Sequence, residues 1–422
     1  MNRLLYSLLL YLLSPLLLLY LALRASRSAD YRGRWAERFG LATLQPCDLL
    51  IHSVSMGETL AALPLIRAIL ARKPGIRITV TTTSPTGSAE VVKALGAQVQ
   101  HCYLPFDLPW CVARFLRVLN ASELIIMETE LWPNLIHLAK VRGMKVQLAN
   151  ARLSAKSAAS YHKWHRLTGP MLASIDRIAV QTQIEAERFQ SLGVAAQRIA
   201  VCGSLKFDLQ IDESRREQAR QLRQHWGRDR DPVWVAGSVH PGEFAAVLAA
   251  HKVLLTRFPQ ALLIFVPRHP EQFVAAAQAI VDAGLSLAKR SANDMPVPGV
   301  QVLLGDTMGE LLTWYGVASI YQGAAFVGGT LIHSGGHNPL EPAAMGLPVA
   351  LGPNHWDFTE ISRLLQQAGN LTLVQDGEVL GELLSLWFTD EPARATAGAA
   401  GLAVVEQNRG ALEKQLAWLS QE

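Results

Sequence analysis

The chain has 422 residues, half of them apolar, and carries a net charge of +4. This length is too great for one ordinary hydrophobic core, the apolar content excludes long disorder, and the small charge argues against a nucleic-acid-binding protein. The four cysteines are scattered and form no C-x-x-C pair, as expected of reduced thiols in a cytosolic protein. We therefore expect two packed domains.

The first 24 residues predict a membrane anchor. Positions 4–23 hold no charged residue and are dominated by leucine, and about 20 apolar residues suffice for a helix to cross a bilayer core. Five arginines follow between positions 24 and 38, against Arg3 alone in front, so the positive-inside rule places the rest of the chain in the cytoplasm. The same asymmetry disfavours the alternative, a cleaved signal peptide. Because Ser14-Pro15 interrupts the segment, a spanning helix and an interfacial helix are both open.

Beyond the anchor, short apolar stretches alternate with helical ones. Strands are predicted in the first half at 48–53, 76–84, 123–128, 145–150, 177–181 and 198–203. A second series is predicted at 233–237, 261–267, 300–305, 318–327 and 348–351, and a helix near 396–419 closes the chain. Such alternation predicts βαβ units, so each half is expected to be a Rossmann-like α/β domain with a parallel sheet. Ligands of these sheets bind beyond the carboxyl ends of the strands, where we expect a cleft.

The expected domain boundaries follow from this alternation. They are a membrane anchor at 1–24, a first Rossmann-like domain at 25–209, a charged linker at 210–231 and a second Rossmann-like domain at 232–422. The last helix is a candidate to pack back on the first domain. Asp229-Arg230-Asp231, the only D-x-D in the chain, lies in the linker, and we interpret it as a solvated segment and not as a metal site.

Glu58 follows the first predicted strand and has two interpretations. Ser55 and Glu58 fit a capping box, S-x-x-E, in which the carboxylate only satisfies a backbone N–H. The same carboxylate lies at the carboxyl edge of the strand, beside Gly57, where a ligand can approach. From spacing alone, the capping role is favoured.

Two further charged sites end strands of the first half. Glu128 and Glu130 are two residues apart, so they share a face if the chain stays extended, and a carboxylate at the end of an apolar strand is costly to bury without a role. Alternatively, both are acids at the start of the helix that begins at Pro133. Lys206 either aims at the cleft or pairs with Asp208.

The second half offers groups that suit a phosphate and a ribose. Arg268 lies between two prolines and presents a rigid fork for phosphate or carboxylate. Thr307 and Glu310 predict a capped helix start, where free N–H groups favour an anion. Glu341, after a glycine-rich turn, can accept two hydrogen bonds from a ribose diol. A zinc site at His333 and His337 lacks the matching ligands and spacing.

In this order, these strings resemble the Kdo (3-deoxy-D-manno-octulosonic acid) transferase family. The matching strings are HSVSMGET, TSPTGS, METELWPN, NARLS, GSLKFD, PRHPE, GDTMGEL and GGHNPLEPA. The resemblance implies a GT-B glycosyltransferase that moves Kdo from CMP-Kdo to a lipid A precursor, lipid IVA, with inversion. It also implies lipopolysaccharide core biosynthesis at the cytoplasmic side of the bacterial inner membrane, with no metal ion and no other cofactor.

The resemblance also implies residue roles. Glu58 matches the general base, and Glu128 and Lys206 match residues that support the transition state. The CMP-binding positions are Pro267, Arg268, Met308, Gly309, Glu310, Asn338 and Glu341. Basic residues that could contact lipid phosphates, or could simply form a solvated face, are Arg152, Lys156, Lys163 and Arg166. Two rivals are a GT-B enzyme that uses a UDP-sugar and a catalytically idle, membrane-anchored nucleotide-binding protein.

Overall fold

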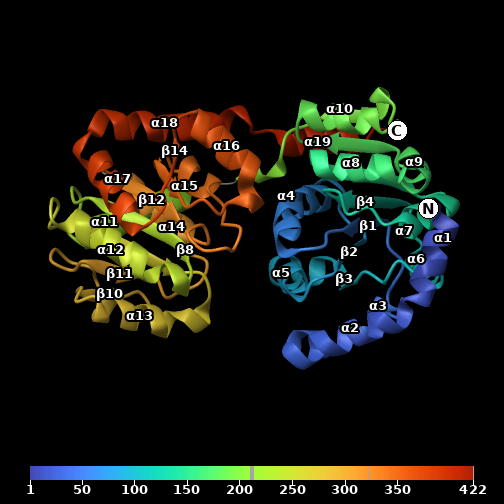
Figure 1. The fold of residues 1–422 in the computed structure, drawn as a ribbon, viewed down its shortest axis with the longest axis horizontal. Coiled ribbons are helices and arrows are strands. Elements are labelled where there is room, and N and C mark those ends of the chain that lie inside the picture. The colour runs from blue at the N-terminus through green and yellow to red at the C-terminus, as the bar shows by residue number, and fades with distance from the viewer. Residues whose placement is uncertain (210–212, 322, 422) are drawn as a thin grey trace. The chain divides into compact units, whose positions relative to one another are not determined.

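The computed structural model of the chain describes residues 1–209, 213–321 and 323–421. The chain divides into two compact units, Met1–Asp208 with Arg409–Glu422, and Leu209–Asn408 (Figure 1). Each unit contains its own parallel sheet with helices packed on it. Each unit therefore has a core of its own, and the C-terminal residues of the chain belong to the first unit.

Within the described residues of the first unit, seven parallel strands lie in the order β3-β2-β1-β4-β5-β6-β7. The strands are β1 (Leu49–His52), β2 (Ile78–Thr82), β3 (Gln100–Tyr103), β4 (Glu123–Met127), β5 (Lys145–Ala151), β6 (Arg177–Val180) and β7 (Ile199–Val201). β1 and β4 are hydrogen-bonded neighbours in register Leu49↔Glu123. The loops that leave these two strands therefore start side by side at the carboxyl edge of the sheet.

Helices cover both faces of this sheet. One face carries α4 (Met56–Arg72), α5 (Pro85–Leu95) and α19 (Ala411–Leu419). The other carries α6 (Pro109–Leu119), α7 (Pro133–Val141), α9 (His165–Ala173) and α10 (Gln183–Ser191). Leu49 and Ile51 pack in the core under α4, α5 and α19, whereas Leu50 packs in the core on the opposite face of the sheet. This happens because successive side chains of a strand point to opposite faces. A strand that serves two cores therefore carries apolar side chains on both faces.

The second unit repeats this plan. Its described residues form a parallel sheet in the order β10-β11-β9-β8-β12-β13-β14. The strands are β8 (Val233–Val239), β9 (Leu262–Pro267), β10 (Leu287–Lys289), β11 (Val302–Leu304), β12 (Gly323–Val327), β13 (Val349–Leu351) and β14 (Leu371–Leu373). The helices are α11 (Glu213–His225), α12 (Phe244–Leu255), α13 (Phe273–Asp282), α14 (Leu311–Ser319), α15 (Leu340–Ala344), α16 (Thr359–Gln367), α17 (Gly377–Thr389) and α18 (Glu391–Gln407).

Two predicted elements differ from the structure. The strand expected at 318–327 starts only at Gly323, because α14 continues to Ser319. The single helix expected near 396–419 is two helices, α18 and α19, separated at Gly410, which adopts a left-handed φ of 86°. The carboxylate of Asp208 accepts the N–H groups of Gly410 and Leu412, which fastens the start of α19 to the first unit.

The predicted linker is mostly part of the second unit. Residues 210–212 lie outside the described residues, and α11 occupies most of the remaining span. The side chains of Arg223 and Arg228 are buried; Arg223 donates to the carbonyl of Val317, and Arg228 pairs with Asp231 at 3.0 Å. The solvated interpretation of the D-x-D is therefore wrong for Asp231, which neutralises a buried guanidinium.

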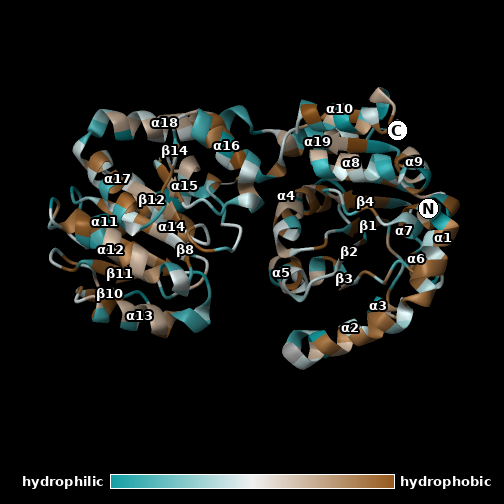
Figure 2. Cartoon of the chain, viewed as in Figure 1, coloured by the Kyte–Doolittle hydropathy of each residue, from teal (hydrophilic) through white to brown (hydrophobic). Residues whose placement is uncertain are grey.

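The leucine-rich N-terminus forms two helices. α1 (Arg3–Leu12) and α2 (Ser14–Arg27) meet at a bend of 55°, and Pro15 lies in the first turn of α2, where a missing N–H is tolerated. Among the described residues, no single helix has the length and apolarity to cross a membrane, whereas the bent pair meets both criteria by length and composition alone. Figure 2 shows that the pair is mostly hydrophobic. The predicted interruption at Ser14-Pro15 is confirmed.

Candidate active site

Glu58 lies in the first turn of α4, just beyond the carboxyl end of β1. Ser55 is the N-cap of this helix, and its hydroxyl accepts the backbone N–H of Glu58 at 3.4 Å. The Glu58 carboxylate accepts the backbone N–H of Val54 at 2.7 Å and the hydroxyl of Ser55 at 2.9 Å. The N-cap role of Ser55 is therefore confirmed, whereas the Glu58 carboxylate bonds the N–H of Val54, one residue before the cap, in place of the reciprocal bond to Ser55 that a capping box has. The side chain is nevertheless only half-buried, and a Cβ added at Gly57 would meet only the Ser55 hydroxyl, at 3.9 Å, so the approach to Glu58 is open.

The surroundings of Glu58 favour its protonated form. Burial raises the pKa of its carboxyl to about 7 against the opposing hydrogen bond from Val54, and the negative charges of Glu130 and Glu128 raise it further. Burial, followed by the charge of Glu128, also raises the pKa of Glu130. Three carboxyl groups thus share one region at the ends of β1 and β4. A carboxyl with a pKa near 7 can take up and release a proton at physiological pH.

Glu128 leaves β4 in a left-handed conformation, with a φ of 53°. The prediction that Glu128 and Glu130 share a face of an extended chain is therefore wrong, because the strand ends at Met127. The alternative puts both acids just before Pro133, at the N-terminus of the next helix; α7 does begin at Pro133, but its N-cap is Trp132 and no side chain caps it. A positive φ is uncommon outside glycine and often marks a functional site.

Lys206 faces Glu128. Its Nζ lies 3.8 Å from Glu128 Oε1, and each side chain is about one-fifth exposed. Asp208, the alternative partner, instead caps α19 as described above. The structure therefore brings Glu58, Glu128 and Lys206 together at one edge of the first sheet, from loops that follow β1, β4 and β7.

Asn150 supports this arrangement and was not predicted as a site residue. It lies in β5 with a φ of 51°, and its side-chain oxygen accepts the N–H of Leu205, next to Lys206, at 3.0 Å. Its own N–H donates to the buried Gln415 of α19 at 2.9 Å. Within the described residues its buried Nδ2 has no hydrogen-bond partner, which is uncommon for a polar atom in a core. Asparagine adopts left-handed conformations more readily than most residues, so the string NARLS at the end of a predicted strand could have indicated Asn150.

In the second unit, an arginine and three histidines gather where β8 and β9 end. Pro267 is the last residue of β9, and Arg268 donates its backbone N–H to the carbonyl of Val239. The rings of His240 and His337 stack, with their Nε2 atoms 2.9 Å apart, and His269 lies edge-on to His240. Burial, with Arg268 as the next cause, lowers the pKa of His337 to about 3. In such a neutral pair, one ring donates the N–H at Nε2 and the other ring accepts it. The nearby guanidinium of Arg268 suits an anion.

His333 does not join this cluster. Its ring packs against Trp356, with the ring centres 4.5 Å apart, while His337 contacts His240. The two histidines considered as a zinc pair therefore have different partners.

Glu243 organises the glycine-rich turn and was missed by the sequence analysis. Its side chain is completely buried, and its carboxylate accepts four backbone N–H groups at 2.8 to 3.0 Å. These donors belong to His240, Gly329, Thr330 and Leu331. One carboxylate therefore ties the loop after β8 to the loop after β12. The string HPGE directly after a strand is the signal that could have indicated it.

Glu341 lies in the first turn of α15 near Arg268. Burial raises the pKa of its carboxyl to about 7, opposed by the Asn338 amide at 3.5 Å and by the charges of Arg268 and Arg215. Arg215 belongs to α11 and also donates to the carbonyl of Gly309 at 3.5 Å. The segment expected to be a linker thus supplies a cation to this site.

The segment with Met308, Gly309 and Glu310 is a loop. The helix expected from Thr307 begins at Leu311, and Glu310 caps no backbone N–H. Its carboxylate instead accepts the Thr307 hydroxyl and pairs with Arg290 at 2.9 Å. Met308 is about half exposed, and Gly309 has a φ of 86°. Glu310 is therefore held as part of an ion pair, which leaves the backbone of this loop to approach a ligand.

Comparison with known proteins identifies the chain. A family model described as 3-deoxy-D-manno-octulosonic-acid transferase matches residues 33–209. The 3-deoxy-D-manno-octulosonic acid transferase of Haemophilus influenzae is 39% identical over 99% of this chain and 97% of its own length. The chain belongs to the Kdo transferase family. The Kdo transferase of Bordetella pertussis is also similar, with 35% identity over 94% of each chain.

The Kdo transferase is therefore a glycosyltransferase, and the predicted family and activity are confirmed. Its fold is similar to that of the UDP-GlcNAc 2-epimerase of Neisseria meningitidis, with a TM-score of 0.52 and 13% identity over 85% of this chain and 98% of the other. A glycosyltransferase from Rickettsia africae gives a TM-score of 0.52 and 12% identity over 90% and 100% of the two chains. These likenesses concern the fold alone, and they confirm the predicted GT-B class with two Rossmann-like sheets.

Proposed function

We propose that this Kdo transferase moves Kdo from CMP-Kdo to a lipid A precursor in lipopolysaccharide core biosynthesis, with Glu58 as the general base. The observation that carries the base assignment is the position of Glu58 among Glu128 and Glu130, where burial and like charges raise its pKa to about 7. In the proposed step, the carboxylate takes the proton of the acceptor hydroxyl while the oxygen attacks the anomeric carbon of Kdo. The bond from that carbon to the phosphate oxygen breaks, and CMP leaves with the electron pair, which inverts the configuration.

The second unit is proposed to hold the donor. The leaving phosphate develops negative charge, which Arg268 and nearby loop N–H groups are suited to stabilise. Glu341 is proposed to accept hydrogen bonds from the ribose diol, and the Asn338 amide, 3.5 Å from its carboxylate, is proposed to help orient it. Pro267, Met308, Gly309 and Glu310 are proposed to shape the rest of the CMP site.

Lys206 and Glu128 are proposed to act on the transition state. A cation 3.8 Å from a carboxylate keeps both groups ordered at low exposure. Lys206 then offers positive charge near the carboxylate group of Kdo or the attacking oxygen, and Glu128 keeps its ammonium in place.

The first unit is proposed to face the cytoplasmic side of the bacterial inner membrane, where its lipid acceptor lies. The support is the N-terminal helix pair, whose exposed leucines include Leu4, Leu12 and Leu16, each at least 57% exposed. Exposed apolar side chains gathered on one segment mark a surface that contacts a membrane or a partner, and an interfacial helix lies with its apolar face in the lipid.

The test is a reaction of the purified protein with CMP-Kdo and a tetraacylated lipid A precursor, with products resolved by mass. The expected result is release of CMP together with an acceptor heavier by whole Kdo residues. A thermal shift with CMP but not UDP is expected in parallel. Protection by UDP alone, or binding of CMP without any product, would replace the proposal with one of the two rivals.

A further inference from the structure

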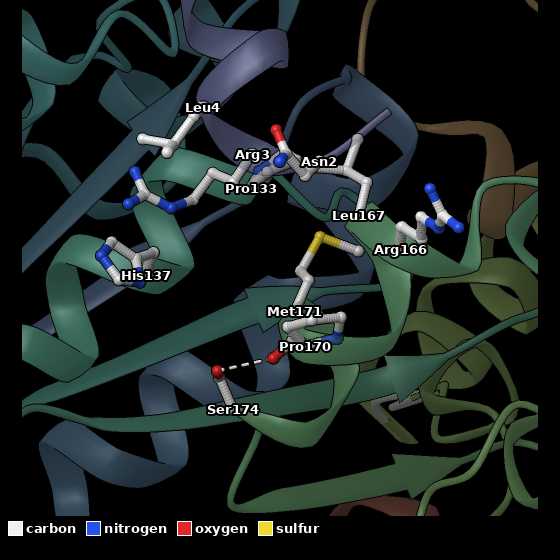
Figure 3. A pocket seen from close by; sticks show the side chains of 10 residues that line it. All are labelled: Asn2, Arg3, Leu4, Pro133, His137, Arg166, Leu167, Pro170, Met171 and Ser174. Carbon is white, nitrogen blue, oxygen red and sulfur yellow. Dashed lines mark hydrogen bonds between the residues drawn. The ribbon is translucent and has the colours of Figure 1, made fainter.

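A pocket of about 270 Å³ lies beside the N-terminal end of α1. Its walls come from the start of the chain, from α7 and from α9, and they include Arg3, Leu4, His137, Arg166 and Met171 (Figure 3). Arg166 is one of the basic residues predicted as candidate contacts for lipid phosphates, and none of these residues belongs to the proposed catalytic or CMP-binding groups. The pocket is therefore a separate feature of the first unit.

The pocket combines positive charge with an apolar wall. None of the described residues that line it is acidic. Figure 3 shows Arg3 beside His137 at one end and Arg166 at the other, with the Met171 thioether between them. Leu167, which is buried, extends the apolar wall. Two guanidinium groups that flank an apolar wall suit an anion attached to an apolar group.

Polar contacts hold α1 in the place that forms this pocket. Asn134 Oδ1 accepts Arg3 Nη1 at 3.2 Å and the Ser7 hydroxyl at 3.0 Å. The Tyr6 hydroxyl donates to the buried Asp107 at 3.1 Å, and Asp107 also accepts the backbone N–H of Asn134 at 2.9 Å. Because this network fixes Arg3, the pocket is built before any ligand arrives, which lowers the entropic cost of binding.

The apolar wall continues outside the pocket. Leu4 lines the pocket and is 70% exposed, and Leu8 and Leu12 follow at helical spacing with 55% and 67% exposed. Residues four apart lie on one face of a helix, so these three leucines form a row that starts at the pocket. A molecule with its charge in the pocket can lay an alkyl chain along that row.

We propose that this pocket binds the anionic headgroup of a membrane phospholipid, with the headgroup lying between the guanidinium groups of Arg3 and Arg166 at its two ends and an acyl chain along Leu4, Leu8 and Leu12. A free phosphate would use only the charged groups and leave the leucine row uncovered. The inference rests on the membrane placement proposed above, and it adds a lipid site that the transfer reaction does not require.

The test is native mass spectrometry of the full chain released from a nonionic detergent. The protein is offered equal amounts of dioleoyl phosphatidylglycerol and dioleoyl phosphatidylcholine. We expect one phosphatidylglycerol retained per chain, in preference to phosphatidylcholine. Arg166→Gln and Arg3→Gln are each expected to weaken retention about fivefold, the effect of one basic residue near an anionic lipid surface. Arg142→Gln is the matched control, since Arg142 is an exposed arginine at the end of α7 that does not line the pocket.

Several outcomes would overturn the inference. Equal retention of the two lipids would show that charge is not recognised, and an equal loss in Arg142→Gln would show diffuse attraction without a pocket. If sn-glycerol 3-phosphate displaces bound phosphatidylglycerol as effectively as added phosphatidylglycerol does, the pocket is a free-phosphate site. A higher acceptor KM for Arg3→Gln in phospholipid-free detergent would assign the pocket to the acceptor. In that case Kdo transfer by the wild-type chain would still support the proposed function.

Discussion

Lys206 Nζ lies 3.8 Å from Glu128 Oε1 and thereby connects the loop after β7 to the loop after β4. If this ammonium stabilises charge in the transition state, Lys206→Gln should lower kcat by about 10²- to 10³-fold with a small change in Tm. Steady-state kinetics and thermal unfolding measure both effects. Lys252→Gln removes an exposed charge from α12 and should leave kcat unchanged. A kcat of Lys206→Gln close to that of the wild type would remove the lysine from the reaction.

Glu58→Gln should separate the capping role from the catalytic role. The glutamine amide oxygen can still accept the Val54 N–H, so the melting temperature should stay near that of the wild type. The amide cannot accept the acceptor proton, so the rate should fall by about 10²- to 10⁴-fold. A fully active Gln variant would end the base assignment.

The rate should depend on pH through Glu58. A base must be ionised, and the pKa of Glu58 is raised to about 7, so kcat/KM should fall about tenfold per pH unit below 7 and level off above it. Glu130→Gln removes a like charge, which should lower the pKa of Glu58 and move the midpoint of the profile to lower pH. A midpoint that stays in place in this variant would contradict the proposed coupling.

CMP affinity should also depend on pH, through Glu341. The ribose diol donates to an ionised carboxylate, and burial raises the pKa of Glu341 to about 7, so affinity should increase as the pH rises through 7. Calorimetric titration of CMP at several pH values measures this. Glu341→Gln should bind CMP about tenfold more weakly and without this dependence, because a hydrogen bond to a charged group is lost. Unchanged binding would remove Glu341 from the ribose role.

Glu243→Gln should loosen the second unit. The amide presents one acceptor atom where the carboxylate presents two, so at least one buried N–H among Gly329, Thr330 and Leu331 loses its partner. We expect the free energy of unfolding to fall by about 3 kcal/mol and CMP affinity to fall with it. Glu271→Gln, an exposed carboxylate in the loop after β9, is the control. Equal Tm values for the two variants would show that Glu243 does not hold the loops.

Three strands, β3, β10 and β14, were not predicted from the sequence, and each lies at an edge of its sheet. β3 is at one edge of the first sheet, and β10 and β14 are the two edges of the second. An edge strand has one neighbour and partial exposure, so it needs no continuous apolar run. Gln100 and His101 in β3 are accordingly only half-buried. The central strands were predicted because both of their faces are covered.

By itself, the sequence determined the two Rossmann-like halves, the Kdo transferase family, the leucine-rich segment and the candidate groups at the ends of central strands. Each of these leaves a local pattern, since a strand buried on both faces must be apolar and a loop at its carboxyl end is free to carry polar residues. Only the tertiary structure decided which polar groups meet. Glu243 collects N–H groups from residues 86 to 88 positions away, and Lys206 reaches Glu128 across the sheet. Contacts between residues so distant in the chain depend on how the strands are ordered, and no local spacing records that order.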